Sequence, residues 1–70
     1  MSTPPVTLMT SGREVLFEFT VIGSVVKVAA IDAATGIEVI VMGPSHASRG
    51  DLQKLALAKL RRRLENSGSR

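Results

Sequence analysis

The dipeptide Gly23-Ser24 constrains the fold of this chain more than any other feature, because it interrupts a long run of β-forming residues. Glycine at the first central position is typical of a two-residue type II′ turn, which joins two antiparallel strands. With these two residues as the turn, Ile22 pairs with Val25, and the register of the whole hairpin follows. The sequence therefore predicts a β-hairpin centred on residues 23–24.

The first strand of this hairpin covers residues 14–22, where apolar side chains recur at every second position. Alternate side chains of a strand point to opposite faces, so one face carries no charge and is expected to line the core. The register places Phe19 opposite Val28 and Phe17 opposite Ala30, so that apolar residues meet apolar residues. The predicted core residues of the first strand are Val15, Phe17, Phe19 and Val21.

A second turn is expected at residues 32–36. Asp32 suits the start of a type I turn, and Gly36 suits the positive φ that closes it. A four-residue loop pairs Asp32 with Ile37, and the next apolar run then continues the same core face as a third strand. Pro44 ends this strand, because proline cannot donate to the ladder. The pattern predicts a three-stranded antiparallel meander.

The residues after the meander predict one helix, from about Arg49 to Glu65, which is rich in good helix formers. Ser48 is the expected N-cap, with Ser45 as the alternative. At about 100° per residue, one apolar arc faces the sheet. The predicted fold class is therefore α+β, a three-stranded antiparallel meander with one C-terminal helix packed on one face (β-β-β-α). The residues of the apolar arc are Leu52, Ala56, Leu57, Leu60 and Leu64.

Seventy residues make one small domain, which we place at residues 13–65. Residues 1–12, rich in Ser, Thr and Pro, are expected to form a flexible leader, and residues 66–70 a frayed tail. The alternation of Val6 and Leu8 also allows a short extra strand within the leader. No apolar run is long enough to span a membrane, and the first dozen residues lack the pattern of a secretory signal. We therefore expect a cytoplasmic location without membrane contact.

The second face of the predicted sheet carries many large aliphatic side chains, and a single helix cannot cover both faces. An exposed apolar face of this kind is typical of an interface, although antiparallel sheets also leave half-apolar faces in water. The candidate covers are a second copy of the chain, a different protein and the folded-back leader. We expect a protein-interaction module that forms a homodimer or binds an unidentified protein partner. The candidate interface residues are Leu16, Ile22, Val25, Ile31, Ile40 and Met42.

Positive charge is concentrated in the last third of the chain. Residues 46–70 carry seven basic side chains and two acidic ones, whereas residues 1–45 carry two and four. Phosphate contact by this strip gives the alternative function, a nucleic-acid-binding accessory protein. Base stacking on the sheet is not expected, because Phe17 and Phe19 face the core. The candidate nucleic-acid contacts are Lys54, Lys59, Arg61, Arg62 and Arg63.

Few residues suit catalysis, and we expect no enzyme activity, cofactor or metal site. His46 is the single histidine and there is no cysteine, so the usual zinc ligands are not clustered. Glu14 and Glu18 lie roughly 13 Å apart along one strand, which is too wide for paired acid–base catalysis. Ser45 and Ser48 flank His46, but both are explained as helix-capping candidates. The glycine-containing turns also differ from phosphate-binding loops, which lead from a strand into a helix.

Several short motifs along the chain form a recognisable pattern. They are Phe17-Glu18-Phe19, Ile22-Gly23, Val26-Lys27-Val28, Ala30-Ile31-Asp32, Thr35-Gly36, Glu38-Val39, Gly43-Pro44, and Ala56-Leu57 with Lys59-Leu60. Over roughly residues 14–64, this pattern resembles a family of short, uncharacterised bacterial proteins classed as a domain of unknown function. Some members of that family carry a serine hydroxymethyltransferase label, but a chain of this size has no room for that enzyme's cofactor domain. The resemblance implies a fold and no catalytic residues.

Overall fold

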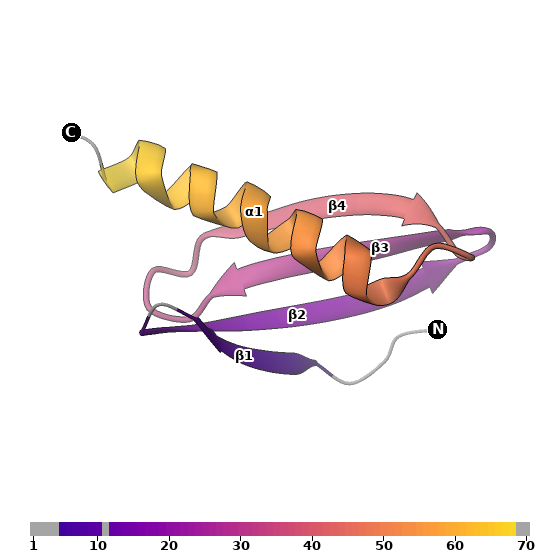
Figure 1. Cartoon of the computed structure of the whole chain (residues 1–70), viewed down its shortest axis with the longest axis horizontal. Helices are drawn as coiled ribbons and strands as arrows, with labels where there is room; N and C mark the ends of the chain where they lie inside the picture. The colour runs from indigo at the N-terminus through magenta and orange to yellow at the C-terminus, as the bar shows by residue number, and fades with distance from the viewer. Residues whose placement is uncertain (1–4, 11, 69–70) are drawn as a thin grey trace.

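The computed structural model describes residues 5–10 and 12–68 as one antiparallel sheet with a helix across one face (Figure 1). The strands lie side by side in chain order, and the helix α1 lies over β3 and β4. The α+β class with a single C-terminal helix is thus confirmed, although the helix ends three residues beyond the expected Glu65. The elements are β1 Val6–Thr10, β2 Arg13–Ile22, β3 Val25–Asp32, β4 Glu38–Pro44 and α1 Arg49–Gly68.

The first predicted hairpin has the predicted register. Gly23 has a φ of 59°, a value that costs glycine little and that the first central position of a II′ turn requires. Ile22 pairs with Val25, and the ladder continues in step to Phe17 opposite Ala30. All the core residues of β2 therefore face the helix side of the sheet, as the alternation predicted.

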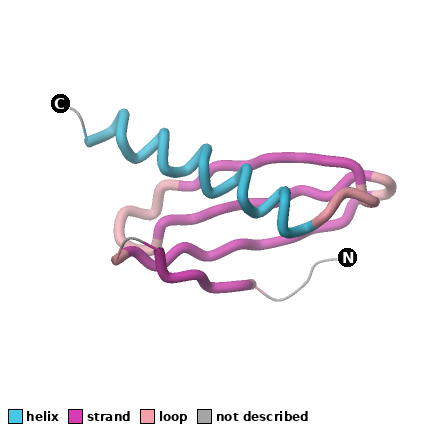
Figure 2. The backbone as a smooth tube through the Cα atoms, in the orientation of Figure 1, coloured by secondary structure: helices cyan, strands magenta, loops and turns pink. Residues whose placement is uncertain are grey.

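The second hairpin also forms as predicted. The Asp32 N–H donates to the Ile37 carbonyl at 2.9 Å, and the Gly36 N–H donates to the Asp32 carbonyl at 2.8 Å. Ala30 then pairs with Val39, so the core face continues onto β4. The short loops that join the strands are drawn in pink in Figure 2.

The prediction of three strands was wrong, because the sheet has four. The fourth strand is β1, which pairs antiparallel with the first half of β2, from Val6 opposite Phe17 to Thr10 opposite Arg13. Gly12, with a φ of 75°, lies in the turn between them. Much of the expected leader is therefore part of the sheet. Residues 1–4 and 11 of that leader and residues 69–70 of the expected tail lie outside the described residues.

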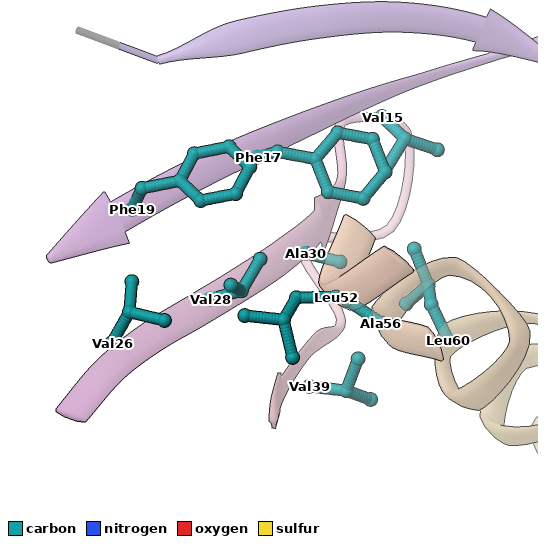
Figure 3. Packing of buried hydrophobic residues seen from close by; sticks show 10 residues of the cluster. All are labelled: Val15, Phe17, Phe19, Val26, Val28, Ala30, Val39, Leu52, Ala56 and Leu60. Carbon is teal, nitrogen blue, oxygen red and sulfur yellow. The ribbon is translucent and has the colours of Figure 1, made fainter. Parts of the chain in front are cut away.

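The core lies between α1 and one face of the sheet (Figure 3). Leu52, Ala56 and Leu60 of the helix lie one turn apart and are buried, as the apolar arc predicted. The helix begins at its expected cap, because the Ser48 hydroxyl accepts a hydrogen bond from the Asp51 N–H at 3.3 Å. The buried cluster consists of Val15, Phe17, Phe19, Val26, Val28, Ala30, Val39, Leu52, Ala56 and Leu60.

Candidate interaction surfaces

The face of the sheet that points away from α1, which we call the outer face, carries a diagonal band of apolar side chains. Leu16 of β2 lies directly opposite Ile31 of β3, and Ala29 of β3 lies directly opposite Ile40 of β4. Because side chains two residues apart share a face, these pairs join into one stripe across β2, β3 and β4, and Met9 of β1, which is diagonal to Leu16, extends it to the fourth strand. We define the apolar band as Met9, Leu16, Ala29, Ile31, Ile40 and Met42.

All six predicted interface residues lie on this outer face, four of them in the band. The other two, Ile22 and Val25, lie opposite one another at the far end of the hairpin, next to Pro44. Met9 was missed, because it belongs to β1, which the sequence offered only as an alternative to a flexible leader. The side chains differ in exposure: Leu16, Val25 and Ile31 are half-buried, whereas Ile22, Ile40 and Met42 are 57%, 40% and 60% exposed.

Charged residues of the outer face surround the band without entering it. Glu14 lies opposite Met9, and Glu38 lies opposite Ile31. Glu18 on β2 and Lys27 on β3 are diagonal neighbours, since Glu18 pairs with Ala29. Opposite charges at diagonal positions attract one another across a strand pair. The centre of the face is therefore electrically balanced.

Among the described residues, the core face contains one buried carboxylate, Asp32, which was predicted from the sequence only as a turn residue. Arg13 donates to it from Nε at 3.0 Å and from Nη2 at 3.3 Å. Thr35 donates to it from the backbone N–H at 3.0 Å and from the hydroxyl at 2.8 Å. The hydrogen bonds from Arg13 and then Thr35 lower the pKa of Asp32 from 3.8 to about 2 against the opposing effect of burial, and the pKa of Arg13 is raised.

The signal for this ion pair is present in the strand register. Extending the first hairpin by two more pairs puts Asp32 opposite Val15, on the core face, and Arg13 follows on that same face. A carboxylate in the core requires a partner, and Arg13 is the cation placed to supply it. The pair fastens the start of β2 to the turn between β3 and β4, so its role is structural.

A groove of about 220 Å³ lies between α1 and the hairpin of β1 and β2. Arg61 crosses it and donates from Nη2 to the Thr10 hydroxyl at 2.6 Å. Ligand pockets usually measure about 300–1,000 Å³, so this groove is suited to a single side chain more than to a cofactor. Its lining residues are Thr10, Arg13, Val15, Leu57, Leu60, Arg61, Leu64 and Glu65.

A second hollow, of about 190 Å³, lies between α1 and β4, and we call it the basic cleft. Lys59 donates from Nζ to the Ile40 carbonyl at 2.7 Å beside it. The helix thus divides the five predicted nucleic-acid contacts: Arg61 points toward β1, and Lys54 lines neither hollow. The residues that line the basic cleft are Val39, Lys59, Arg62, Arg63 and Asn66.

Two further kinds of site to consider among the described residues are a cluster of metal ligands and a helix able to cross a bilayer. His46 is exposed in the loop before α1, and nowhere in the described ranges do three His, Cys, Asp or Glu side chains cluster as metal ligands would. Within the same ranges, no helix combines the length and the apolar character that crossing a bilayer requires.

Comparison with known proteins agrees with the resemblance seen in the sequence. No curated protein and no solved structure is significantly similar to the chain. Residues 12–67 match the family described as "Domain of unknown function (DUF6898)", and this range contains β2, β3, β4 and nearly all of α1. Since the match covers most of the chain, the protein belongs to the DUF6898 family of uncharacterised proteins.

Proposed function

We propose that this protein is a small self-associating module, and that two copies pair through the outer faces of their sheets. The apolar band is the observation that carries the proposal, because it crosses the face that α1 leaves uncovered. Large contiguous apolar patches are uncommon on monomeric soluble proteins and mark interaction sites. Three large apolar side chains of the outer face, Met9, Ile22 and Met42, are more than half exposed.

The size of the outer face supports one large symmetric contact. Four strands about 4.8 Å apart and eight residues of about 3.4 Å each give a face of roughly 19 by 27 Å, on the order of 500 Å² before side-chain relief is counted. A standard interface buries about 600–1,000 Å² on each partner. With the relief of its side chains the outer face approaches that size when all of it but the margin is buried, as a second sheet would achieve.

The charge pattern is compatible with a two-fold axis. In a symmetric dimer the same patch of both copies meets, so an unbalanced charge within it would repel its own image. The apolar band is uncharged, and Glu18 is balanced by Lys27. Glu14 and Glu38 lie at the margin, where water solvates them. The outer face as a whole carries three glutamates and one lysine, a net charge of −2, so two outer faces are able to approach only in an arrangement that leaves Glu14 and Glu38 in contact with water.

The small size of the domain gives a further reason for self-association. A chain of 70 residues without cysteine has neither a large core nor a disulfide. Burial of apolar surface against a second copy adds about 25 cal/mol for each Å² removed from water. Dimerisation would thus stabilise the fold as well as cover the band.

Sedimentation equilibrium of the full chain tests the proposal. We expect a dimer with twice the mass of the 7.4 kDa chain. Ile40→Lys should weaken the dimer about thirtyfold, as loss of a hot spot of about 2 kcal/mol does. Leu55→Lys is the matched control, because Leu55 is an exposed aliphatic residue on α1, away from the outer face. A wild-type chain that remains monomeric at high-micromolar concentration would overturn the proposal.

A second candidate function is nucleic-acid binding through the basic helix. Lys59, Arg62 and Arg63 converge on the basic cleft, where they would neutralise neighbouring phosphates. Such binding must weaken steeply with salt, because each phosphate contact releases counterions. Fluorescence anisotropy with a labelled single-stranded oligonucleotide at low and moderate salt tests this candidate, and an affinity that does not change with salt would exclude it.

A further inference from the structure

The open edge of β4 is a surface distinct from the outer face. Among the described strands, β4 pairs only with β3. In an antiparallel pair, the backbone groups of every second residue bond the neighbouring strand. Because the Asp32 N–H donates to the Ile37 carbonyl, Ile37 and every second residue after it point toward β3. The N–H and C=O groups of Glu38, Ile40 and Met42 consequently point away from β3, where no described strand meets them.

Side chains of α1 flank this edge on the helix side of the sheet. Lys59 donates to the outward carbonyl of Ile40, and Arg62 and Arg63 line the basic cleft next to it. Leu55 lies one turn before Lys59 on the same side of the helix and is 59% exposed. The edge is therefore bordered by three cations and one unburied leucine.

The cations argue against a second copy of the chain as the occupant of this edge. Pairing of β4 with β4 of another copy would bring the two α1 helices together, with Lys59, Arg62 and Arg63 of each facing the same side chains of the other. Like charges repel, and lysine beside a sheet edge is a common protection against edge-to-edge association. An acidic segment would instead be attracted.

Strand geometry determines which sequence pattern the edge would select. Successive side chains of an added strand point to opposite faces of the sheet. Those on the helix side would meet Lys59, Arg62 and Arg63, so acidic residues suit these positions. Those on the other side would lie beside Ile40 and Met42 and extend the apolar band, so aliphatic residues suit them.

We propose that the β4 edge binds an extended segment of another protein in which acidic and aliphatic residues alternate, and that this segment joins the sheet as an additional strand. Main-chain hydrogen bonds to Glu38, Ile40 and Met42 supply affinity, and the two faces supply specificity. Lys59 need not leave the Ile40 carbonyl, because that oxygen has two lone pairs and also accepts from the added strand.

A capped synthetic peptide of alternating glutamate and valine is the probe, titrated into the full chain and followed by NMR. We expect saturable binding and slower hydrogen exchange at the amides of Glu38, Ile40 and Met42. Two control peptides test the pattern: a lysine–valine alternation should not bind, and a peptide with its glutamates and valines in separate blocks should bind at least about tenfold more weakly.

Variants of the chain separate edge addition from simple charge attraction. Arg62→Glu combined with Arg63→Glu should weaken peptide binding about tenfold or more, since two attractive pairs become repulsive. Lys54→Glu reverses one charge on the same helix outside the cleft, so it is the matched control for the single reversals Arg62→Glu and Arg63→Glu, which should each weaken binding where Lys54→Glu does not. Ile40→Pro removes an outward N–H that the ladder does not use, so it should abolish binding while circular dichroism shows an intact fold.

The proposal is overturned if the block peptide binds as tightly as the alternating one, or if binding leaves the three edge amides unprotected. It is also overturned if a single-stranded oligonucleotide occupies the basic cleft and the alternating peptide does not bind. The aliphatic side chains of the peptide lie beside Ile40 and Met42 of the apolar band, so the titration is repeated at protein concentrations where sedimentation shows a monomer and where it shows a dimer, and protection of the three edge amides reports peptide binding in either state.

Discussion

The contact between Gly43 of β4 and Leu52 of α1 sets how closely the helix approaches the sheet, and a double-mutant cycle tests it. A methyl group at position 43 would lie 2.7 Å from Cδ2 and 3.3 Å from Cδ1 of Leu52. Carbon atoms prefer a separation of about 3.5–4.0 Å. Leu52 is only 5% exposed, so it cannot simply turn into solvent.

These distances give the expected magnitudes. Overpacking by Gly43→Ala costs about 1–3 kcal/mol, offset by about 0.4–1 kcal/mol from the stiffer unfolded chain, for a net loss of about 0–2.5 kcal/mol that is centred on about 1.3 kcal/mol. Leu52→Ala alone should cost about 2–5 kcal/mol. In the double variant the new methyl group occupies part of the space that Leu52 leaves, so the combined loss should be smaller than the sum by about 1 kcal/mol or more.

Urea denaturation measures the free energy of unfolding of the four proteins in this cycle. All are compared at one protein concentration, because dimer formation would make apparent stability depend on concentration. Gly50→Ala is the control, since a methyl group there would meet only Ser48 Oγ at an ordinary 3.6 Å, and the stiffer unfolded chain should raise stability by about 0.4–1 kcal/mol. If the two losses add to within about 0.5 kcal/mol, the close approach of α1 to β4 is refuted.

Three further predictions concern the turn, the buried carboxylate and the core. Gly23→Ala should lower the free energy of unfolding by about 1–2 kcal/mol in urea, because its φ of 59° strains other residues; no loss would refute the turn geometry. The pKa of Asp32 is lowered to about 2 by Arg13 and Thr35, so its stabilising effect is complete above its unfolded-state value near 3.8 and disappears as pH falls through about 2. Thermal unfolding midpoints should therefore fall between about pH 4 and pH 2, less steeply in Asp32→Asn, and equal slopes would contradict the ion pair. Leu60→Ala should cost about 2–3 kcal/mol in urea, in the lower part of the usual range because the adjoining groove can admit water to the new space; a loss below about 1 kcal/mol would contradict its buried position.

Local turn chemistry and strict alternation explain why most of the sheet was predictable. A two-residue loop at Gly23 leaves one register in which the core residues Phe17, Phe19 and Val21 of β2 all meet apolar partners, and a slip by one would bury charges. The loop from Asp32 to Gly36 then sets the next register in the same way. The two registers therefore depend only on residues within and next to the two turns.

The strand β1 was only an alternative to a flexible leader in the sequence, because its signal is weak in isolation. Five residues with Val6 and Leu8 alternating form a strand only when a longer strand offers its edge, and β2 does so here. The Ser-Gly dipeptide that precedes Arg13 is a turn signal, and it becomes informative once Thr10 is paired with that residue. Met9 and one end of the apolar band were missed for the same reason.

The outer face was predictable, whereas the division of the basic helix was not. Which side chains share a sheet face follows from the period of two alone. The rotation of α1 about its axis depends on how Leu52 and Leu60 pack against the strands. That packing sends Lys59 toward β4 and Arg61 toward β1. A continuous basic strip in sequence thus becomes two separate features in space.

The proposed dimer is tested most directly by contacts between the two copies. A sample mixed from isotope-labelled and unlabelled protein, examined by a half-filtered nuclear Overhauser experiment, detects only protons that are close across an interface. The proposal predicts cross-peaks that connect the methyl groups of Leu16, Ile31 and Ile40 in one copy to the same face of the other. If such a sample is dimeric and its intermolecular cross-peaks arise from α1 instead, the outer face is not the interface and the proposal is wrong.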